Sequence, residues 1–485
     1  MSEKKGGGPK SSGPVDAVIG NRYFPLAAVI AAILIVFRGL SLFFEVTISF
    51  QGQLLLCAVL ALCYLLANPP GFIKKHNLAV SLLVVVLIFF LGLQVRMATV
   101  NEEATYGSGL TSAMEFIGLT VSDTDEKYLL AADPHFWYVQ TERVLDGIEG
   151  RETPEYDYLR LHPEYQPYEP HLFARIAAYS YKIAHSITGI EFYRFLFWFP
   201  AIVAALSAFP AFWIGRELYS NLAGIFASFF IVFSPSFMSR SIGGFFDTDC
   251  AVIFCSVLVV AFFLAAYNRV DPKNWKKPSP IILSALAGAS LALFAIIWSG
   301  FAYMPWLFAG LFGLHWMYRV YIAEGKDIKE KLRHSWLFFR SHALVYVVMG
   351  IAFLILTLPS QGILPAKQVI DVTTFFQEAK AEGGIFPNVW ISISEEMSAS
   401  SGEVIARAGH LAFGLGLIGL VLLLVMFLQN FGKKSIYPET FFLMIIWIIP
   451  TLYGSIWAFR FVQLLAIPLA ICAGIALGME TPQAE

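Results

Sequence analysis

Residues 78–96 read LAVSLLVVVLIFFLGLQVR, an apolar run whose one charged side chain is its last, Arg96. A helix needs roughly 20 apolar residues to cross the hydrocarbon core of a bilayer. Similar blocks recur along the chain, for example at Tyr23–Phe44 and Phe195–Ile214. The sequence shows no alternating segments of about ten residues, the pattern of membrane barrels. Because a backbone inside lipid must satisfy its own hydrogen bonds, we expect an all-α, polytopic transmembrane helix bundle.

Composition excludes a soluble globular protein. Of 485 residues, 57% are hydrophobic and 14% are charged, whereas soluble domains have about 45–50% and about 25%. The net charge of -2 is uninformative because it averages two opposed faces. The cysteines have no metal-site or disulfide-framework spacing, so we expect small core residues; they are Cys57, Cys63, Cys250, Cys255 and Cys472.

Hydropathy predicts about 12–13 spans, of which 12 can be assigned to residues. Residues 171–188 are apolar but interrupted by Arg175, Lys182 and His185, so we expect an external amphipathic helix there. The predicted spans are 23–45, 53–68, 78–97, 195–214, 220–235, 249–267, 280–298, 301–320, 342–359, 408–428, 438–454 and 459–478.

Basic residues give the orientation, because cytoplasmic loops carry an excess of Lys and Arg. With 12 spans, every basic cluster falls on one side. The loops 98–194 and 360–407 and the short segment 236–248 then face outward, and residues 1–20 form a disordered cytoplasmic tail. The clusters are Lys4, Lys5 and Lys10; Lys74 and Lys75; Arg269, Lys273, Lys276 and Lys277; the loop with Lys326, Lys329, Lys331, Arg333 and Arg340; and Lys433 and Lys434.

The first outward loop contains AADPHFWY, residues 131–138. We expect Asp133 to cap a helix whose first residue is Pro134. A structural cap is the plain interpretation of Asp133, and a catalytic carboxylate is the alternative.

The second outward segment reads SRSIGGFFDTD, residues 239–249. Two carboxylates at the mouth of a span, Asp247 and Asp249, are costly unless something offsets their charge. A divalent cation suits oxygen ligands, and a solvated loop with a helix cap is the alternative. Gly243 and Gly244 permit close approach of the backbone.

Two further outward sites carry charge. Glu395 and Glu396 follow Ser392-Ile-Ser in a long loop, where the alternative is a solvent-facing acid. Arg460 opens the last span and suits a phosphate headgroup, with a snorkelling anchor as the alternative. Arg38, inside the first span, has no clear role.

Together these segments resemble the catalytic subunit of oligosaccharyltransferase, especially its archaeal form. That family has an acidic residue in the first external loop, an Arg-Ser-x-x-Gly-x-Phe-Asp-x-Asp segment similar to 240–249, a Ser-Val-Ser-Glu-like motif similar to 392–395, and an Arg-Phe pair similar to Arg460-Phe461. The resemblance covers roughly residues 78–478. It implies a C-type glycosyltransferase-like catalytic domain there, after an extra N-terminal transmembrane hairpin at 21–77.

The resemblance implies that the enzyme moves an oligosaccharide from a polyprenyl or dolichyl (pyro)phosphate to an asparagine sequon of an acceptor polypeptide. Its localisation would be an archaeal-type plasma membrane or an endoplasmic reticulum membrane. The active site would face outside or into the lumen. The protein would contact membrane lipid and no nucleic acid. It implies that Asp133 and Glu395 are catalytic, that Arg460 and Arg240 bind the lipid phosphate, and that Mn²⁺ or Mg²⁺ is held by Asp133, Asp247, Asp249 and Glu395.

The chain departs from the family in two respects. The family's soluble C-terminal domain carries Trp-Trp-Asp-Tyr-Gly, which reads the sequon hydroxyl, whereas this sequence has no adjacent tryptophans and, we expect, no such domain after the tail 479–485. By the span count, it also has one transmembrane helix fewer than the family before that domain. We therefore expect a variant, a truncated sequence, or a partner subunit that supplies the reader. A polyprenyl-phosphate-sugar transferase with another acceptor, a lipid-linked glycan flippase and a scaffold subunit are the alternatives.

Overall fold

The computed structural model describes residues 50–67, 76–101, 129–147, 170–274, 277–371, 398–432 and 437–479. In these ranges every element is an α-helix or a 3-10 helix, which confirms the predicted all-α class. The chain divides into two compact units, residues 1–80 and 81–485. In the first, α3 spans Phe50–Ala67; α5, Asn77–Asn101, begins at the end of that unit.

In the described ranges, eight helices are long and apolar enough to cross a membrane. They overlap eight of the predicted spans, so the chain is a multi-pass membrane protein. Their bounds are Asn77–Met97, Phe192–Leu218, Asp249–Asn268, Pro278–Ile297, Ile328–Gln361, His410–Gln429, Pro438–Trp457 and Phe459–Leu477.

The other four predicted spans differ. Span 23–45 lies outside the described residues, and 53–68 corresponds to α3. Span 301–320 becomes α15, Tyr303–Ile322, which contains His315 and Arg319 and is not among the eight. Span 220–235 is wrong as a full crossing, because α11 covers only Asn221–Val232, about 18 Å of helix. It ends there because Ser234 precedes Pro235 and is extended, as the proline ring requires.

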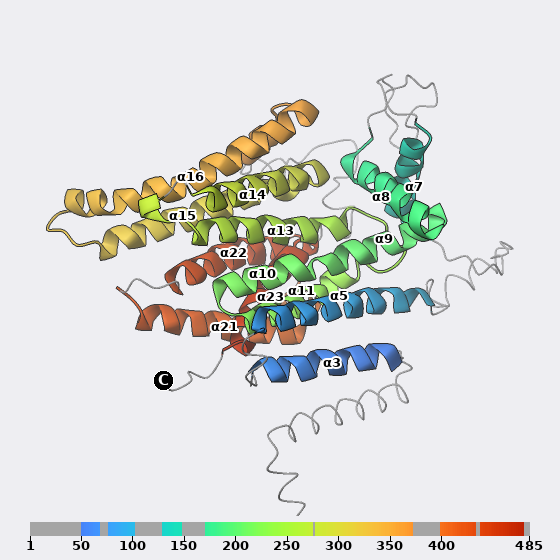
Figure 1. Cartoon of the computed structure of the whole chain (residues 1–485), viewed down its shortest axis with the longest axis horizontal. Coiled ribbons are helices and arrows are strands. Elements are labelled where there is room, and N and C mark those ends of the chain that lie inside the picture. The colour runs from blue at the N-terminus through green and yellow to red at the C-terminus, as the bar shows by residue number, and fades with distance from the viewer. Residues whose placement is uncertain are drawn as a thin grey trace, which may run out of the picture. The chain divides into compact units, whose positions relative to one another are not determined.

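The centre of the larger unit is α13, Asp249–Asn268, which is buried along most of its length. It packs against α9 (Phe192–Leu206), α10 (Ala208–Leu218), α14 (Pro278–Ile297) and α23 (Val462–Leu477). Figure 1 shows these helices running side by side. In turn α23 packs against α11, α21 (His410–Gln429) and α22 (Tyr437–Trp457). Cys63, Cys250, Cys255 and Cys472 are buried and free, as predicted, and Cys57 is partly buried.

Three helices in this core meet at glycines. A methyl group at Gly215 on α10 would lie 2.7 Å from the Gly224 Cα on α11, and one at Gly474 on α23 would lie 2.5 Å from the Ala223 carbonyl oxygen. Small residues allow such close approach of helices in membrane proteins. The helices α10, α11 and α23 can therefore lie this close together only because glycine has no side chain at these positions.

The predicted basic loop between the spans near 320 and 342 is largely helical, which corrects the expectation. One long helix, α16, runs over Ile328–Gln361 and includes Lys329, Lys331, Arg333 and Arg340. Asp327 caps it by accepting a hydrogen bond from the Glu330 backbone N–H at 2.8 Å. Because Lys, Arg and Glu are good helix formers once a cap is present, the span continues beyond its apolar part.

At the opposite end of the bundle from the α15–α16 turn lie α7, Ala132–Leu145, and α8, Leu172–Thr188 (Figure 1). The predicted helix at 171–188 is confirmed. One face of α8 is buried through Phe173, Ala174, Ala177 and Ala178, and the helix packs against α7 and α9. This end of the bundle contains the predicted site residues of the first two outward segments.

Candidate active site

The loop between α12 (Pro235–Met238) and α13 is fixed by its backbone. Gly244 has φ +85°, a conformation that favours glycine. Its N–H donates to the Phe197 carbonyl at 3.0 Å, and its own carbonyl accepts from the Leu130 N–H at 3.0 Å. A methyl group at this position would lie 2.7 Å from the Phe197 ring. The second predicted segment is thereby joined to the chain just before α7.

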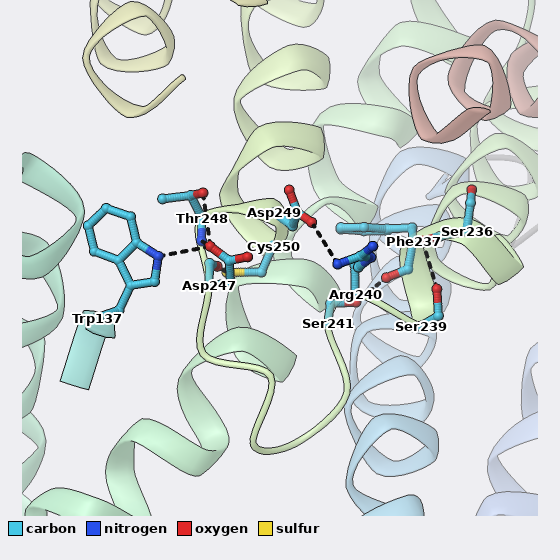
Figure 2. A network of polar contacts seen from close by, with 10 residues as sticks. All are labelled: Trp137, Ser236, Phe237, Ser239, Arg240, Ser241, Asp247, Thr248, Asp249 and Cys250. Atoms are coloured by element: carbon cyan, nitrogen blue, oxygen red, sulfur yellow. Dashed lines mark hydrogen bonds and ion pairs between the residues drawn. The ribbon is translucent and has the colours of Figure 1, made fainter. Parts of the chain in front are cut away.

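Asp247 is held in this loop by several hydrogen bonds (Figure 2). Its side chain is buried, with 8% exposed. Its Oδ1 accepts three hydrogen bonds: from Trp137 Nε1 at 2.9 Å, from the Thr248 backbone N–H at 2.5 Å and from Thr248 Oγ1 at 3.1 Å. These bonds fix the orientation of the carboxylate.

Asp133 lies four residues before Trp137 on α7, so both side chains are on one face of that helix. Burial raises the pKa of Asp247 above its usual range, and the Asp133 carboxylate raises it further, while the Thr248 backbone N–H opposes both. Asp133 itself is exposed. The structure thus brings together carboxylates from the first and second outward segments.

The expected role of Asp133 as a helix cap is wrong. The cap residue is Ala131, with φ 65°, and no side chain caps the helix. Because α7 begins two residues before Pro134, Asp133 falls in the first helical turn. Its carboxylate is then not used by a cap and is left facing the same side as Trp137.

Asp249 is the first residue of α13 and is also buried, with 8% exposed. An Arg240 guanidinium nitrogen lies 3.9 Å from its Oδ2, as Figure 2 shows. The Arg240 guanidinium also lies 5.4 Å from the centre of the Phe245 ring. A helix N-terminus favours a carboxylate, so Asp249 is held by both the helix and the arginine.

Arg240 and Asp249 line a small open pocket together with Arg460. Its interior volume is about 20 Å³, which is room for about one water molecule. Arg460 lies in the short 3-10 turn Phe459–Phe461 before α23. The two arginines that the sequence assigned to a lipid phosphate therefore share one pocket; its full lining is Ser236, Ser239, Arg240, Asp249, Arg407, Phe459, Arg460 and Gln463.

Arg407 belongs to this pocket and was missed in the sequence. It lies on α20, Ser401–Ala408, a short helix with a capping box between Ser400 and Glu403. Its guanidinium stacks on the Phe459 ring at 4.2 Å from the centre. The capping box just before the predicted span at 408 was the signal that could have placed a helix, and hence Arg407, at the outer end of that span.

Within the described ranges, no three His, Cys, Asp or Glu side chains are placed to hold a metal ion. The donors are carboxylate oxygens, which suit Mg²⁺ or Mn²⁺, but Asp249 is engaged by Arg240. The fourth predicted ligand, Glu395, lies outside the described residues, as do Glu396 and Arg38.

Comparison with known proteins bears on this site. The family model for the N-terminal part of oligosaccharyl transferase STT3 matches residues 111–482. Two curated proteins named dolichyl-phosphooligosaccharide-protein glycotransferase are similar. The one from Methanococcus voltae is 25% identical over 84% of this chain and 46% of its own length. The one from Methanocaldococcus jannaschii is 22% identical over 84% of this chain and 52% of its own.

Solved structures agree in fold. The archaeal oligosaccharyltransferase AglB from Archaeoglobus fulgidus, in complex with an inhibitory peptide and a dolichol-phosphate, superposes with a TM-score of 0.55. It is 16% identical over 84% of this chain and 50% of that one. The apo form from the same organism gives 0.53 at 17% identity, over 82% and 50%. The chain spans about half the length of the curated relatives it matches.

Proposed function

The chain belongs to the oligosaccharyl transferase STT3 family, and from that premise we propose that it is the membrane part of an enzyme of protein N-glycosylation. The proposed reaction moves an oligosaccharide from a polyprenyl or dolichyl phosphate or pyrophosphate to the side-chain nitrogen of an acceptor asparagine. The single observation that carries the proposal is the arrangement at one end of the bundle. There, Asp247 is oriented beside Asp133, and Arg240 and Arg460 share a pocket with Asp249.

The carboxylates are proposed to activate the acceptor asparagine. An amide nitrogen is a poor nucleophile because its lone pair is delocalised into the carbonyl group. Asp133 and Glu395 are proposed to accept hydrogen bonds from the amide NH₂ group and so oppose that delocalisation. Asp133 is suited to this because it is exposed on the face of α7 that also carries Trp137. A proton leaves the nitrogen as the new C–N bond forms, and a carboxylate is the acceptor at hand.

The arginines are proposed to act on the lipid-linked sugar donor. As the bond between C1 of the sugar and the phosphate oxygen breaks, negative charge gathers on the departing lipid phosphate. Guanidinium groups neutralise such charge in a bidentate manner. Arg460 and Arg240 are proposed to do so, and the 20 Å³ pocket implies that the phosphate binds at its open side or widens it.

The carboxylates of Asp133, Asp247, Asp249 and Glu395 are proposed to hold Mn²⁺ or Mg²⁺. Such an ion, when bound, would supply positive charge near the leaving group. Trp137 and Thr248 fix Asp247, so that its orientation does not depend on the ion. Residues 78–478 are the proposed catalytic membrane domain, with 21–77 as an added hairpin. The sequon hydroxyl is proposed to be read by a segment or partner subunit outside the motifs found here.

The test is glycan transfer from a lipid extract to a labelled asparagine peptide, by membranes that contain the protein and any partner chain. We expect transfer to require Mn²⁺ or Mg²⁺, and to be lost in Asp133→Asn and Glu395→Gln but kept in the matched variant Glu396→Gln. Full transfer in excess chelator would remove the metal from the proposal. Transfer by Glu395→Gln but not by Glu396→Gln would show that the wrong glutamate was assigned.

A further inference from the structure

Arg96, near the C-terminal end of α5, is fully buried, with 0% of its surface exposed. Its guanidinium donates three hydrogen bonds: to Ser241 Oγ at 2.9 Å, to the Val232 carbonyl at 2.7 Å and to the Gly92 carbonyl at 3.2 Å. It also lies 5.1 Å from the centre of the Phe237 ring. One side chain therefore connects α5, the end of α11 and the loop that carries Asp247.

A backbone hydrogen bond adds a second connection between Arg96 and this loop. The Gly243 N–H donates to the Arg96 carbonyl at 3.1 Å, so the loop is bound to Arg96 through both its side chain and its main chain. Ser241 completes the arrangement, because its hydroxyl donates to the Phe237 carbonyl and so presents its oxygen to the guanidinium. A buried charge is expensive unless it is hydrogen-bonded in this way.

The two contacts lie within the Arg-Ser-x-x-Gly part of the second outward motif. Ser241 follows Arg240 directly, and Gly243 precedes Gly244, which binds the Phe197 carbonyl. The proposed phosphate and metal groups of this motif, Arg240 and Asp247, are thus on either side of the segment that Arg96 holds. Ser241 and Gly243, to which no chemical role is assigned, thus both contact Arg96.

We propose that Arg96 is a positioning residue, which holds the loop 239–249 so that Arg240, Asp247 and Asp249 keep their places for the transfer reaction. The part about the reaction rests on the proposed function; the part about holding the loop does not. Lysine cannot replace it, because its ammonium is a point charge, whereas the guanidinium has a planar fork that reaches three acceptors in different directions.

Hydrogen exchange read by mass spectrometry on the full chain in detergent tests the tether directly. In Arg96→Lys and in Ser241→Ala, the amides of peptides covering 239–248 should exchange about 10- to 100-fold faster, the effect of losing a hydrogen bond to a charged group. Peptides from α13 and α23 should be unchanged. Ser284→Ala is the matched control for Ser241→Ala, because its buried hydroxyl also donates to the carbonyl four residues back, that of Pro280 at 2.7 Å. Arg269→Lys is the control for charge, since that arginine pairs with Glu217 at 2.7 Å.

The transfer assay then tests the positioning. The turnover number should fall about tenfold in Ser241→Ala, with the KM for the acceptor peptide little changed and with activity unaffected in Ser284→Ala. Unchanged exchange over 239–248 in Ser241→Ala would overturn the proposal, and so would faster exchange with normal turnover. If Arg96→Lys does not fold, Ser241→Ala decides. A wild-type protein that transfers no glycan but shows the expected exchange would sink the proposed function while leaving the tether in place.

Discussion

The two ends of α13 hold their charged side chains differently. Near Asn268, a histidine and an arginine lie against one carboxylate, that of Glu439, whereas near Asp249 one carboxylate is oriented by neutral donors and the next is paired with an arginine. The two ends belong to a single helix of about 30 Å, and its packing on neighbouring helices continues between them. At the Asp249 end, neutral donors orient Asp247, and an Arg240 nitrogen lies 3.9 Å from Asp249 Oδ2.

At the Asn268 end, the polar and charged side chains contact one another. His315 Nε2 lies 3.1 Å from Glu439 Oε1, and an Arg319 nitrogen lies 3.6 Å from the same oxygen. Tyr267 near the end of α13 contacts His315 Nδ1 at 2.9 Å. A cavity of about 790 Å³ adjoins the group, lined by Arg319, His342 and Glu439 among others. The larger cavity thus lies beside side chains that contact one another.

The difference separates two uses of a charge in a membrane protein. Charges that pair with one another stabilise the fold, because removing one partner is costly, whereas a carboxylate oriented by neutral donors, as Asp247 is, can still take a cationic ligand. The size of a cavity does not distinguish the two. We therefore expect substitutions at the Asp249 end to change activity more than stability, and substitutions at the Asn268 end to do the reverse.

The largest expected effect tests the first half of this contrast. Asp247→Asn keeps the size of the side chain but removes its charge, and we expect transfer to fall by about 10²- to 10³-fold, the loss typical of one electrostatic catalytic contact. The midpoint of thermal unfolding should stay the same or rise, because burial disfavours the charged form. A large fall in the midpoint would mean that this end, too, is mainly structural.

Arg319→Gln tests the other half. It removes the cation from Glu439, which lies 19% exposed beside it, and we expect a loss of about 2 kcal/mol in the free energy of unfolding, since a half-broken buried pair is costly. Transfer measured well below the unfolding temperature should be nearly normal. The double variant Arg319→Gln with Glu439→Gln should recover part of the loss; no recovery would show that the pair is not what stabilises this end.

Trp137→Phe sharpens the contrast, since it removes a donor from Asp247 Oδ1 but keeps an aromatic ring. With one hydrogen bond to a charged group lost, we expect transfer to fall about tenfold. Trp198→Phe on α9, an exposed tryptophan, is a matched control with no expected change. Normal transfer in Trp137→Phe would leave Thr248 as the residue that orients Asp247.

The smallest effect is expected beyond the Asn268 end, in the exposed pair of Lys277 and Asp271 at 3.0 Å. Its hydrogen bond from Lys277 holds the pKa of Asp271 below the usual range. In Lys277→Ala, we expect that pKa to rise and the unfolding midpoint to be unchanged, because exposed pairs contribute little. A clear fall in the midpoint would show that the pair of Lys277 and Asp271 contributes to stability despite its exposure, which would contradict this prediction.

Hydropathy predicted most of the helices correctly, because burial in lipid imposes one requirement on every span. It failed where a neighbouring segment decides the outcome. The helix α11 stops at Pro235, and α16 continues past its apolar part because Asp327 caps it. Neither event changes the mean hydropathy of the span concerned.

Short motifs assigned Asp247, Asp249 and Arg240 to the candidate site, and the structure places these three residues in one loop and the helix that follows it. What those motifs could not show is contact between distant segments. Arg96 is separated from Ser241 by 145 positions, and in the sequence it is only the polar end of a span. The group around Glu439 was missed for the same reason, since its members come from different helices. Ala131 adopts φ 65°, a local conformation that no pattern in the sequence announces.

The glycines between α10, α11 and α23 have a consequence for recognising distant relatives. Gly474 on α23 and Gly478, which directly follows that helix, lie four residues apart, and both face Ala223 of α11, beside Gly224. A larger residue at any of them would push backbones apart, so the spacing of these positions records the distance between helices. We therefore expect distant relatives with this fold to keep small residues at the corresponding positions, independently of the charged motifs that the chemistry requires.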